Sequence, residues 1–373
     1  MKNIRIEKVA SRSDRKKFIA FPWKVYKNDP HWVPPLVMEV KEKISRTKNP
    51  FFEHAEMELF LAYRDSDVTG RIAAIVDDNH NSFHNEKVVF FGLYESFDDR
   101  ETAGALLEAV EKWGIKKGME TLRGPMNLSM NDECAFLLEG FDSPPVIMMP
   151  YNPPYYLDLM TGCGLGKAKD LYAFYMKRED AISAQIDRIV TKTKMEIPLT
   201  IRTIDMKNLE EEAARIKDVY NHAWEKNWGF VPWTDKEMDY MAKKLKLVAD
   251  PELVVIAEHD GKPVAFAFAL PNLNEAIKRM NGKTTPMAVL KFLYYRRKIK
   301  GIRALVFGIL EEFRNTGVSY MLYAEIDKNS LARGYEWCET SWQLEDNEPV
   351  NRFVESLGGR VYKKYRIFEK KIQ

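Results

Sequence analysis

Apolar and polar positions follow an ordered pattern over residues 303–370. An apolar strand leads into a polar turn, and a helix starts near Ser319. A second strand is predicted at residues 335–342. Pro349 suits the first turn of a helix, which the pattern predicts to end at a pair of glycines before a last strand over residues 360–368. The pattern therefore predicts an α/β domain in this part of the chain.

The same pattern occurs twice. Shifting the sequence by 216 positions places residues 91–95, Phe-Gly-Leu-Tyr-Glu, on residues 307–311, Phe-Gly-Ile-Leu-Glu, without a gap. Upstream, residues 60–74 and 255–265 each predict a hairpin, in which apolar strands flank a polar turn that contains glycine. Similarity at one offset predicts two copies of one fold unit.

We therefore predict two domains, residues 1–177 and residues 199–373. A charged stretch at residues 178–198, which the composition predicts to be helical, joins them as a linker. The chain has 373 residues, of which 45% are hydrophobic, and this is enough for two separate cores.

Charge and cysteine content argue against several classes of protein. The net charge is +2, so the chain as a whole does not attract nucleic acid. Its three cysteines lie far apart, which argues against a zinc site and for a reducing compartment. The first residues lack an apolar signal segment, and no run approaches the ~18 apolar residues of a spanning helix. We expect a cytoplasmic protein without a metal centre or a nucleic-acid partner.

A phosphate-binding turn is predicted at Arg314, Gly317 and Ser319. The spacing Arg-x-x-Gly-x-Ser between a strand and a helix presents backbone N–H groups and a helix dipole to a phosphate. This spacing resembles the acyl-CoA-binding motif of the GNAT acyltransferase superfamily, (Gln/Arg)-x-x-Gly-x-(Gly/Ala), with a small serine at the last position. In that superfamily an Asn opens the next helix, as Asn347 does here.

This resemblance implies an α/β fold with two tandem GNAT-like domains, each a mixed central sheet flanked by helices. It also implies acyl-CoA as the cosubstrate, either acetyl-CoA or a long-chain acyl-CoA. The residues that would bind it are Ile309, Leu310, Glu311, Arg314, Asn315, Thr316, Gly317, Val318, Ser319 and Asn347.

Only the second copy is predicted to bind acyl-CoA. In the first copy, the three positions that match the motif are Asp98, Glu101 and Ala103. Acidic residues suit a helix N-terminus but repel a pyrophosphate, by about 1 kcal/mol for charges ~4 Å apart in water. The phosphate loop of the first copy is therefore degenerate. The alternative is that neither copy binds acyl-CoA and that the turn at Arg314 only connects a strand to a helix.

Each copy carries an extra segment. Residues 124–150 of the first copy are rich in aromatic residues, Met and Pro, and they form either a wall of an acceptor pocket or a packed cover over the domain interface. In the second copy, residues 286–300 join an apolar body to a basic end. Such a helix lies on an anionic membrane surface, closes over an acyl chain or docks on its own domain.

An aromatic cluster in residues 221–233 lies where a loop of GNAT enzymes borders the acceptor site. Its three tryptophans suit a large apolar ligand and a protein core equally, whereas the amides of Asn221 and Asn227 offer specific hydrogen bonds. The predicted substrate-binding residues are Asn221, Trp224, Asn227, Trp228, Trp342 and Tyr155.

Short segments along the full length resemble a bacterial tandem-GNAT family that includes the bacterial ceramide synthases, which join a fatty acyl group from a thioester to the amine of a sphingoid base. These segments include Trp32-Val33-Pro34-Pro35, Asn49-Pro50-Phe51-Phe52, Arg123-Gly124-Pro125-Met126-Asn127, Tyr151-Asn152-Pro153-Pro154-Tyr155-Tyr156, Asn227-Trp228-Gly229-Phe230 and Glu339-x-Ser341-Trp342.

A GNAT-type transfer needs an N–H donor for the thioester carbonyl, a base for the amine and a proton for the leaving thiolate. Many members of the superfamily use a Tyr as the acid, seven residues after the helix Asn, but this position is Val354 here. Tyr365 and Tyr362 are the substitute candidates, and direct departure of the thiolate is the alternative. Glu339 is the predicted base, because it lies on the strand beside the expected thioester and shares a face with Ser341; the alternative is a salt-bridged structural carboxylate.

The sequence therefore predicts an acyl-CoA-dependent N-acyltransferase with a small-molecule or lipid amine as acceptor. In one interpretation the enzyme transfers a long-chain acyl group to a sphingoid base. The first alternative is an N-acetyltransferase that acts on a small amine or a protein, and the second is an inactive module that binds CoA or lipid. Peripheral contact with the inner membrane face and an acyl-carrier protein as donor both stay open.

Overall fold

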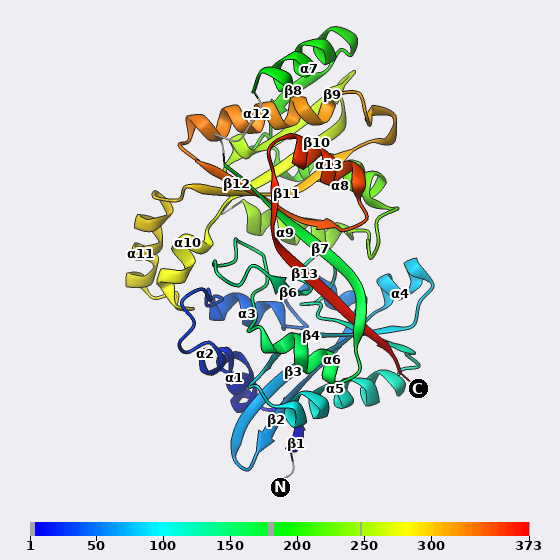
Figure 1. Ribbon diagram of the computed structural model, residues 1–373, viewed down its shortest axis with the longest axis vertical. Coiled ribbons are helices and arrows are strands. Elements are labelled where there is room, and N and C mark those ends of the chain that lie inside the picture. Colours follow the sequence, from blue (N-terminus) through cyan, green and yellow to red (C-terminus); the bar gives the residue numbers. More distant parts are fainter. Residues whose placement is uncertain (1–3, 178–182, 247, 373) are drawn as a thin grey trace. The chain divides into compact units, whose positions relative to one another are not determined.

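The computed structural model describes residues 4–177, 183–246 and 248–372 and divides into two compact units (Figure 1). Unit 1 comprises Met1–Leu171, Ile277–Leu290 and Lys363–Gln373, and unit 2 comprises Tyr172–Ala276 and Lys291–Tyr362. Of the predicted linker, residues 178–182 lie outside the described residues, and α7 (Ser183–Glu196) follows them in unit 2.

Unit 1 is built on a sheet with the strand order β1-β2-β3-β4-β5-β13, and β6 also pairs with β13. Strands β1 to β4 pair antiparallel, whereas β4 and β5 run parallel. The elements of this unit are β1 (Ile4–Lys8), α1 (Arg12–Ala20), α2 (Pro22–Val25), α3 (Val37–Lys43), η1 (Pro50–Glu53), β2 (Ala55–Arg64), β3 (Asp67–Asp77), α4 (Asp78–His84), β4 (Val88–Ser96), α5 (Arg100–Ile115), β5 (Thr121–Gly124), β6 (Phe136–Glu139), α6 (Tyr155–Gly162) and η4 (Lys278–Met280).

Unit 2 repeats this arrangement with the order β8-β9-β10-β11-β12-β7. Strands β8 to β11 pair antiparallel, and β11 and β12 run parallel. Its elements are α7, β8 (Thr200–Thr203), α8 (Leu209–Trp224), α9 (Asp235–Leu245), η3 (Pro251–Leu253), β9 (Val254–His259), β10 (Lys262–Pro271), β11 (Gly301–Ile309), η5 (Glu311–Phe313), α12 (Val318–Ala332), β12 (Trp337–Leu344) and α13 (Glu348–Ser356). Four elements cross from one unit's residues to the other's: β7 (Gly166–Lys177), α10 (Asn274–Ile277), α11 (Pro286–Arg296) and β13 (Arg360–Lys371).

The compact units differ from the sequence domains 1–177 and 199–373 because the two copies exchange their last strands. The C-terminal strand β13 pairs with β5 of unit 1, and Phe368 belongs to the hydrophobic core of that unit. Conversely, Phe174 and Met176 of β7 belong to a core cluster of unit 2, together with Val354 of α13. Each unit therefore completes its sheet with a strand that the sequence assigns to the other copy.

The elements predicted for the second copy are present in the structure, and most of the last strand belongs to unit 1. The strand predicted at residues 335–342 is β12, the helix before the glycine pair is α13, and the last strand is β13. The predicted hairpin at residues 255–265 is β9 with β10, and its counterpart in unit 1 is β2 with β3. No helix within the described residues is long and apolar enough to cross a membrane.

Lys363 of β13 offers a test of the exchanged strand. Its side chain is only 1% exposed, and Nζ donates to the carbonyl oxygens of Ser143 and Pro144 at 3.0 and 2.8 Å. Lys363→Met would remove this buried donor from both carbonyls, and we expect a loss of about 2 to 3 kcal/mol in the free energy of unfolding. Lys364→Met, which removes a half-exposed ion pair with Glu139, should cost less than about 1 kcal/mol. Urea denaturation would measure both, and equal costs would contradict this account of Lys363.

Two glycines at the ends of α12 form a second matched pair. Gly317 and Gly334 both have positive φ, 90° and 79°. A Cβ at Gly317 would lie 2.0 Å from Oγ1 of Thr193, whereas a Cβ at Gly334 meets nothing within 4 Å. Gly334→Ala should therefore cost about 1 kcal/mol for its backbone conformation alone, and Gly317→Ala clearly more, because α7 must also move. Thermal unfolding of the two variants would show this order; a smaller cost at Gly317 would exclude the contact with α7.

Candidate functional site

The parallel strands β11 and β12 pair only along their first halves. Their register runs from Gly301 opposite Trp337 to Ala304 opposite Thr340, while β11 continues to Ile309. On the other side, β11 stays paired with β10, and the N–H of Leu310 donates to the carbonyl of Val264 at 3.0 Å. Because backbone groups alternate along an antiparallel pair, Ile309 directs its N–H away from β10. The N–H of Leu310 thus already donates within the sheet. Ile309 is therefore the better candidate for the predicted N–H donor to the thioester carbonyl.

The turn after β11 ends in a helix start without a side-chain cap. Gly317 is the N-cap of α12, and the first turn of this helix holds no acidic residue. The first N–H groups of a helix have no partner within the helix, and the helix dipole adds a partial positive charge there. The start of α12 is therefore suited to an anionic ligand such as a pyrophosphate.

The equivalent helix of unit 1, α5, has a filled N-terminus. Asp99 is its N-cap and accepts a hydrogen bond from the N–H of Glu101 at 3.2 Å. Arg64 pairs with both carboxylates, at 2.8 and 3.0 Å. These groups satisfy the helix start and would repel a phosphate, so the contrast between α5 and α12 supports a single cosubstrate site.

The edge of β4 in unit 1 is occupied by the chain itself. After β5, the N–H of Met126 donates to the carbonyl of Phe91 at 2.8 Å, and the side-chain oxygen of Asn127 accepts from the N–H of Leu93 at 2.8 Å. The chain approaches so closely that a Cβ at Gly92 would lie 1.8 Å from the oxygen of Met126. The start of the first extra segment therefore fills the place that corresponds to the diverging edge of β11.

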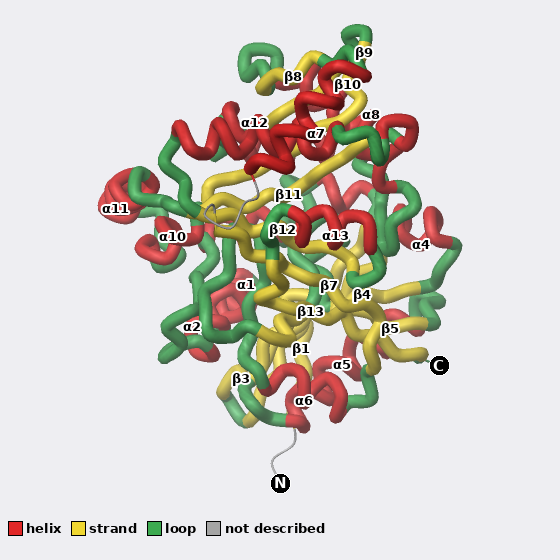
Figure 2. Tube along the Cα trace, turned by 45° about the horizontal axis from the view of Figure 1, so that its top comes forward, coloured by secondary structure: helices red, strands yellow, loops and turns green. Residues whose placement is uncertain are grey.

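The side chains of the phosphate turn mostly hold the turn itself. Arg314 donates to the carbonyl oxygens of Ile309 and Ala223, at 3.3 and 3.0 Å. Thr316 donates through Oγ1 to Phe313 O at 2.6 Å, and its own carbonyl accepts from Thr193 at 3.1 Å. Figure 2 shows α7, which carries Thr193, beside α12. The turn is therefore fixed to β11 and α8 by the Arg314 side chain, and to α7 by the carbonyl of Thr316.

The remaining predicted cosubstrate residues differ in how far they are accessible. Val318 is fully buried, so that only its backbone could contact a ligand, whereas Ser319 is half-buried. Glu311 forms an exposed ion pair with Lys226 at 3.0 Å, and this hydrogen bond lowers the pKa of its carboxyl. Asn315 has a positive φ of 61°. Asn347 is the N-cap of α13 as predicted, without a side-chain hydrogen bond to that helix.

Glu339 lies in a buried polar network on β12. Its side chain is fully buried, and its two carboxylate oxygens accept hydrogen bonds from the hydroxyls of Ser341 and Tyr362. Arg303, the residue opposite Glu339 in the strand register, donates to Oγ and to the carbonyl oxygen of Ser341 at 3.0 and 3.1 Å. The structure thus brings the predicted base together with Tyr362, the half-buried end of the network.

Three other titratable residues lie in different surroundings, one of them in unit 2 and two in unit 1. Burial raises the pKa of the Cys338 thiol to about 12, so this thiol stays protonated at neutral pH. Tyr365 lies in unit 1, is 1% exposed and stands opposite Leu137 in the register of β13 with β6. Tyr155 also belongs to unit 1, and its hydroxyl donates to Ser96 O at 2.8 Å. Burial raises the pKa of the Tyr155 hydroxyl.

The predicted substrate-binding residues of unit 2 include one with an unused polar atom. Trp224 packs on Tyr220 within a core cluster and donates through Nε1 to Phe307 O at 3.2 Å. Trp228 and Trp342 are half-buried, and the backbone N–H of Asn227 donates to Trp224 O at 2.8 Å. Asn221 differs, because its buried Oδ1 has no hydrogen-bond partner among the residues that the structure describes. A buried amide oxygen of this kind is suited to an N–H donor of a ligand.

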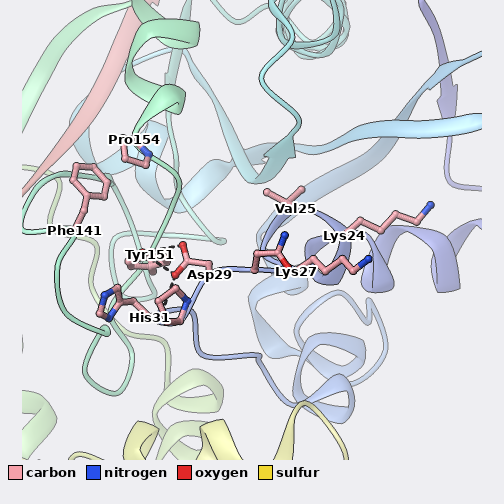
Figure 3. Close-up of a pocket in the computed structure, with 10 residues that line it drawn as sticks. Lys24, Val25, Lys27, Asp29, His31, Phe141, Tyr151 and Pro154 are labelled. Carbon is pink, nitrogen blue, oxygen red and sulfur yellow. Dashed lines mark hydrogen bonds between the residues drawn. The ribbon is translucent and has the colours of Figure 1, made fainter.

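Unit 1 contains a cavity of about 550 Å³ that is lined in part by Tyr151 and Pro154 (Figure 3). Asp29 lies at its centre and accepts hydrogen bonds from the Tyr151 hydroxyl at 3.0 Å and from the N–H of His31 at 2.8 Å. Burial and the neighbouring Asp29 carboxylate raise the pKa of Tyr151. Tyr151 belongs to the Tyr-Asn-Pro-Pro-Tyr-Tyr segment that follows the first extra segment, where Val146 and Met149 are buried.

No sequence motif indicated two residues of the candidate site, Arg303 and Thr193. Arg303 carries no motif, and only the register of two parallel strands places it beside Glu339 and Ser341. Thr193 lies in the predicted linker, far from the phosphate turn in sequence. Within the described part of the chain, no group of three or more His, Cys, Asp or Glu side chains is arranged to hold a metal ion.

Known structures with a similar fold are tandem GNAT proteins. A tandem GNAT protein from the clavulanic acid biosynthesis pathway matches with a TM-score of 0.58 and 11% sequence identity, over 100% of this chain and 99% of the other. A GCN5-related N-acetyltransferase from Sphaerobacter thermophilus matches with a TM-score of 0.54 and 13% identity, over 99% and 96%. These matches confirm the predicted tandem GNAT fold.

No family model matches the sequence. Two other proteins have a much higher sequence identity to this chain than the proteins of solved structure do. Protein YghO of Escherichia coli (strain K12) is 35% identical over 370 residues, which cover 97% of this chain and 94% of that protein. The bacterial ceramide synthase of Caulobacter vibrioides is also 35% identical over 370 residues, which cover 97% and 96%. At this identity and coverage, the chain belongs to the bacterial tandem-GNAT acyltransferase family that contains these two proteins.

Proposed function

We propose that this protein transfers a long-chain acyl group from acyl-CoA to the amine of a sphingoid-type lipid. The observation that carries the proposal is the combination, within unit 2, of an uncapped helix start at α12, a strand β11 that diverges from β12, and a buried carboxylate on β12. The 35% identical relative from Caulobacter vibrioides is named a ceramide synthase, which supports the choice of acyl group and acceptor.

In this proposal the backbone of the turn binds the pyrophosphate of acyl-CoA. The first N–H groups of α12, at Val318 and Ser319, and the positive end of the helix dipole provide the attraction. Arg314 acts mainly by holding the turn, since its guanidinium donates to two carbonyl oxygens. The pantetheine arm would lie along the edge of β11 beyond Ala304, where the pairing with β12 ends.

The amine would bind near Asn221. Its buried Oδ1 accepts no hydrogen bond from any described residue, and an amine N–H is a suitable donor for it. Trp228 and Trp342, both half-buried, would contact the apolar part of the acceptor. In this arrangement the tryptophans bind the apolar part of the acceptor, and the amide oxygen of Asn221 accepts a hydrogen bond from its amine.

Proton transfer would run through Tyr362. Glu339 is fully buried and bonded to two hydroxyls, so it reaches a substrate only through one of them. As the amine attacks the thioester carbon, Ile309 N–H would stabilise the oxyanion, and the amine proton would pass to Tyr362 as Tyr362 gives its own to Glu339. The C–S bond then breaks, and the thiolate takes a proton from Tyr362 as Glu339 returns its own to Tyr362, which gives free CoA and the amide and restores the Glu339 carboxylate.

We also propose that the reaction takes place on the cytoplasmic side of the inner membrane, with the protein bound peripherally. A long-chain amine partitions into the lipid phase, so an enzyme that uses it needs access to the bilayer surface.

Ser319 allows the pyrophosphate site to be tested without harming the helix. Ser319→Glu places a carboxylate in the first turn of α12, where the helix dipole favours it, so stability should hold or rise. The same charge repels a pyrophosphate, and we expect the Kd for CoA to rise about tenfold or more. Isothermal titration of CoA would measure this, beside Ser319→Gln as the neutral variant of equal size.

Ser319→Gln should bind CoA within about threefold of the unsubstituted protein, since it adds no charge. Equal CoA affinity in Ser319→Glu would reject α12 as the pyrophosphate site. Loss of affinity in both variants would point to steric exclusion and leave the electrostatic argument without support.

Glu339→Gln tests the proton path. We expect kcat for acyl transfer to a sphingoid amine to fall by about 10²- to 10⁴-fold at neutral pH, because the amide cannot accept the proton. The deficit should shrink as the pH approaches the amine pKa of about 10, where free amine no longer requires a base. Release of free CoA from palmitoyl-CoA, followed with a thiol reagent, gives the rate at each pH.

Tyr362→Phe should show the same pH-dependent deficit, whereas Glu355→Gln, an exposed carboxylate on α13, should leave kcat unchanged. A deficit in Glu339→Gln that stays constant with pH would favour the alternative of a structural carboxylate. Tight binding of palmitoyl-CoA without turnover of any amine would reject the enzyme and leave a binding module.

A further inference from the structure

Helix α11, which Figure 1 labels, exposes an unusual amount of apolar surface. Five of its large apolar side chains are exposed: Met287 by 63%, Leu290 by 60%, Tyr294 by 56%, Leu293 by 48% and Val289 by 39%. Twelve large apolar side chains are exposed in the whole described part of the chain, so one short helix holds five of them. Its only buried residue is Ala288. The helix therefore contributes little to a core of its own.

The most exposed of these residues share one face of the helix. Met287, Leu290 and Tyr294 are spaced i, i+3 and i+7, which brings them to the same side of an α-helix. Leu293 and Val289 extend this face around the helix, and the exposed Lys291 lies at its border. The result is a continuous apolar strip on the surface of the protein rather than scattered side chains.

Positive charge is concentrated around the same helix. The chain as a whole has a net charge of only +2, yet residues 278–300 hold eight Lys and Arg and no Asp or Glu. Lys291, Arg297 and Lys298 are all exposed. Nζ of Lys298 lies 4.3 Å from the ring centroid of Tyr294, so a cation sits directly at the apolar strip. Apolar and cationic groups are therefore presented together.

We propose that α11 is the surface by which the protein docks on an anionic phospholipid bilayer, with its apolar side chains in the interface and its cations at the lipid phosphates. Stable binding of this kind needs both an apolar and an electrostatic contribution, and α11 supplies both. The inference rests on the proposed function, because an enzyme that uses a long-chain amine must reach the bilayer that holds it. At eleven residues, α11 is too short to span the bilayer and would lie along its surface.

Charge argues against a second copy of this chain as the partner. In a two-fold dimer through α11, the eight cations of one segment would face the same eight cations of the other, with no acidic residue in either segment to compensate. An anionic lipid surface instead attracts the exposed cations Lys291, Arg297 and Lys298. It also accepts apolar side chains between its headgroups, which the phosphate backbone of a nucleic acid does not.

The test uses the full-length protein and vesicle flotation. One set of vesicles contains phosphatidylcholine alone, and a second contains phosphatidylcholine mixed with phosphatidylglycerol. We expect binding to the anionic vesicles to be at least about tenfold stronger than to the neutral ones. Two variants test the two contributions, Met287→Gln/Leu290→Gln/Tyr294→Gln for the apolar strip and Lys291→Gln/Arg297→Gln/Lys298→Gln for the charge. Each should weaken binding by about tenfold or more, and added salt should weaken the unsubstituted protein and the apolar variant more than the charge variant.

A matched control removes three exposed cations from α1, Arg12→Gln/Arg15→Gln/Lys16→Gln, and should change vesicle binding less than about twofold. Equal loss in this control would show a general charge effect and overturn the role of α11. Absence of vesicle binding by the unsubstituted protein would overturn it as well. A dimer in solution that the apolar variant converts to a monomer would assign the strip to a second copy instead.

Activity measurements separate this inference from the proposed function. With a short-chain acyl-CoA and a water-soluble amine, the α11 variants should keep kcat within about twofold, whereas turnover of a long-chain amine held in anionic vesicles should fall about tenfold. If the protein binds anionic vesicles through α11 but turns over no amine, the docking surface stands and the proposed function fails. If it turns over both amines and the α11 variants change neither rate, the function stands and the docking surface fails.

Discussion

The backbone hydrogen-bond groups on the outer edge of β11 are the constraint on which the site depends. A strand whose neighbour diverges must satisfy its N–H and C=O groups in another way. In unit 1 the chain does this itself, because Met126 and Asn127 bond to β4 just after β5. In unit 2 the indole N–H of Trp224 donates to the carbonyl of Phe307, and Ile309 directs its own N–H away from β10. The same architecture therefore has a filled edge in one unit and a candidate ligand edge in the other.

The two helix starts repeat this contrast. At α5, the carboxylate of Asp99 caps the helix N-terminus, and the guanidinium of Arg64 pairs with this carboxylate. At α12, the chain places no acid, and it uses Gly317 at a position where a side chain would strike Thr193. The two copies therefore differ both at the strand edge and at the helix start. In unit 1 the protein's own side chains satisfy the start of α5. In unit 2 the positive end of the α12 dipole has no acidic side chain in its first turn.

The network around Glu339 shows how a buried carboxylate can be held without exposure to water. Burying a charge is costly unless hydrogen bonds compensate it, and the hydroxyls of Ser341 and Tyr362 supply two. Arg303 supports Ser341 in turn, through its hydroxyl and its carbonyl. The half-buried Tyr362 at one end of the network fits the proposed path for protons.

The sequence by itself determined the repeated fold, because the periodicity of apolar residues and the offset of 216 positions are local properties of the chain. It also indicated which copy has a helix start without an acidic cap, since helix caps depend on neighbouring residues such as Asp99 or Gly317. Only the tertiary structure decided that the copies exchange their last strands, that Arg303 meets the Ser341 beside Glu339, and that Tyr365 lies in unit 1. Strand register and partner choice arise from contacts between residues far apart in the chain, and no local pattern encodes them.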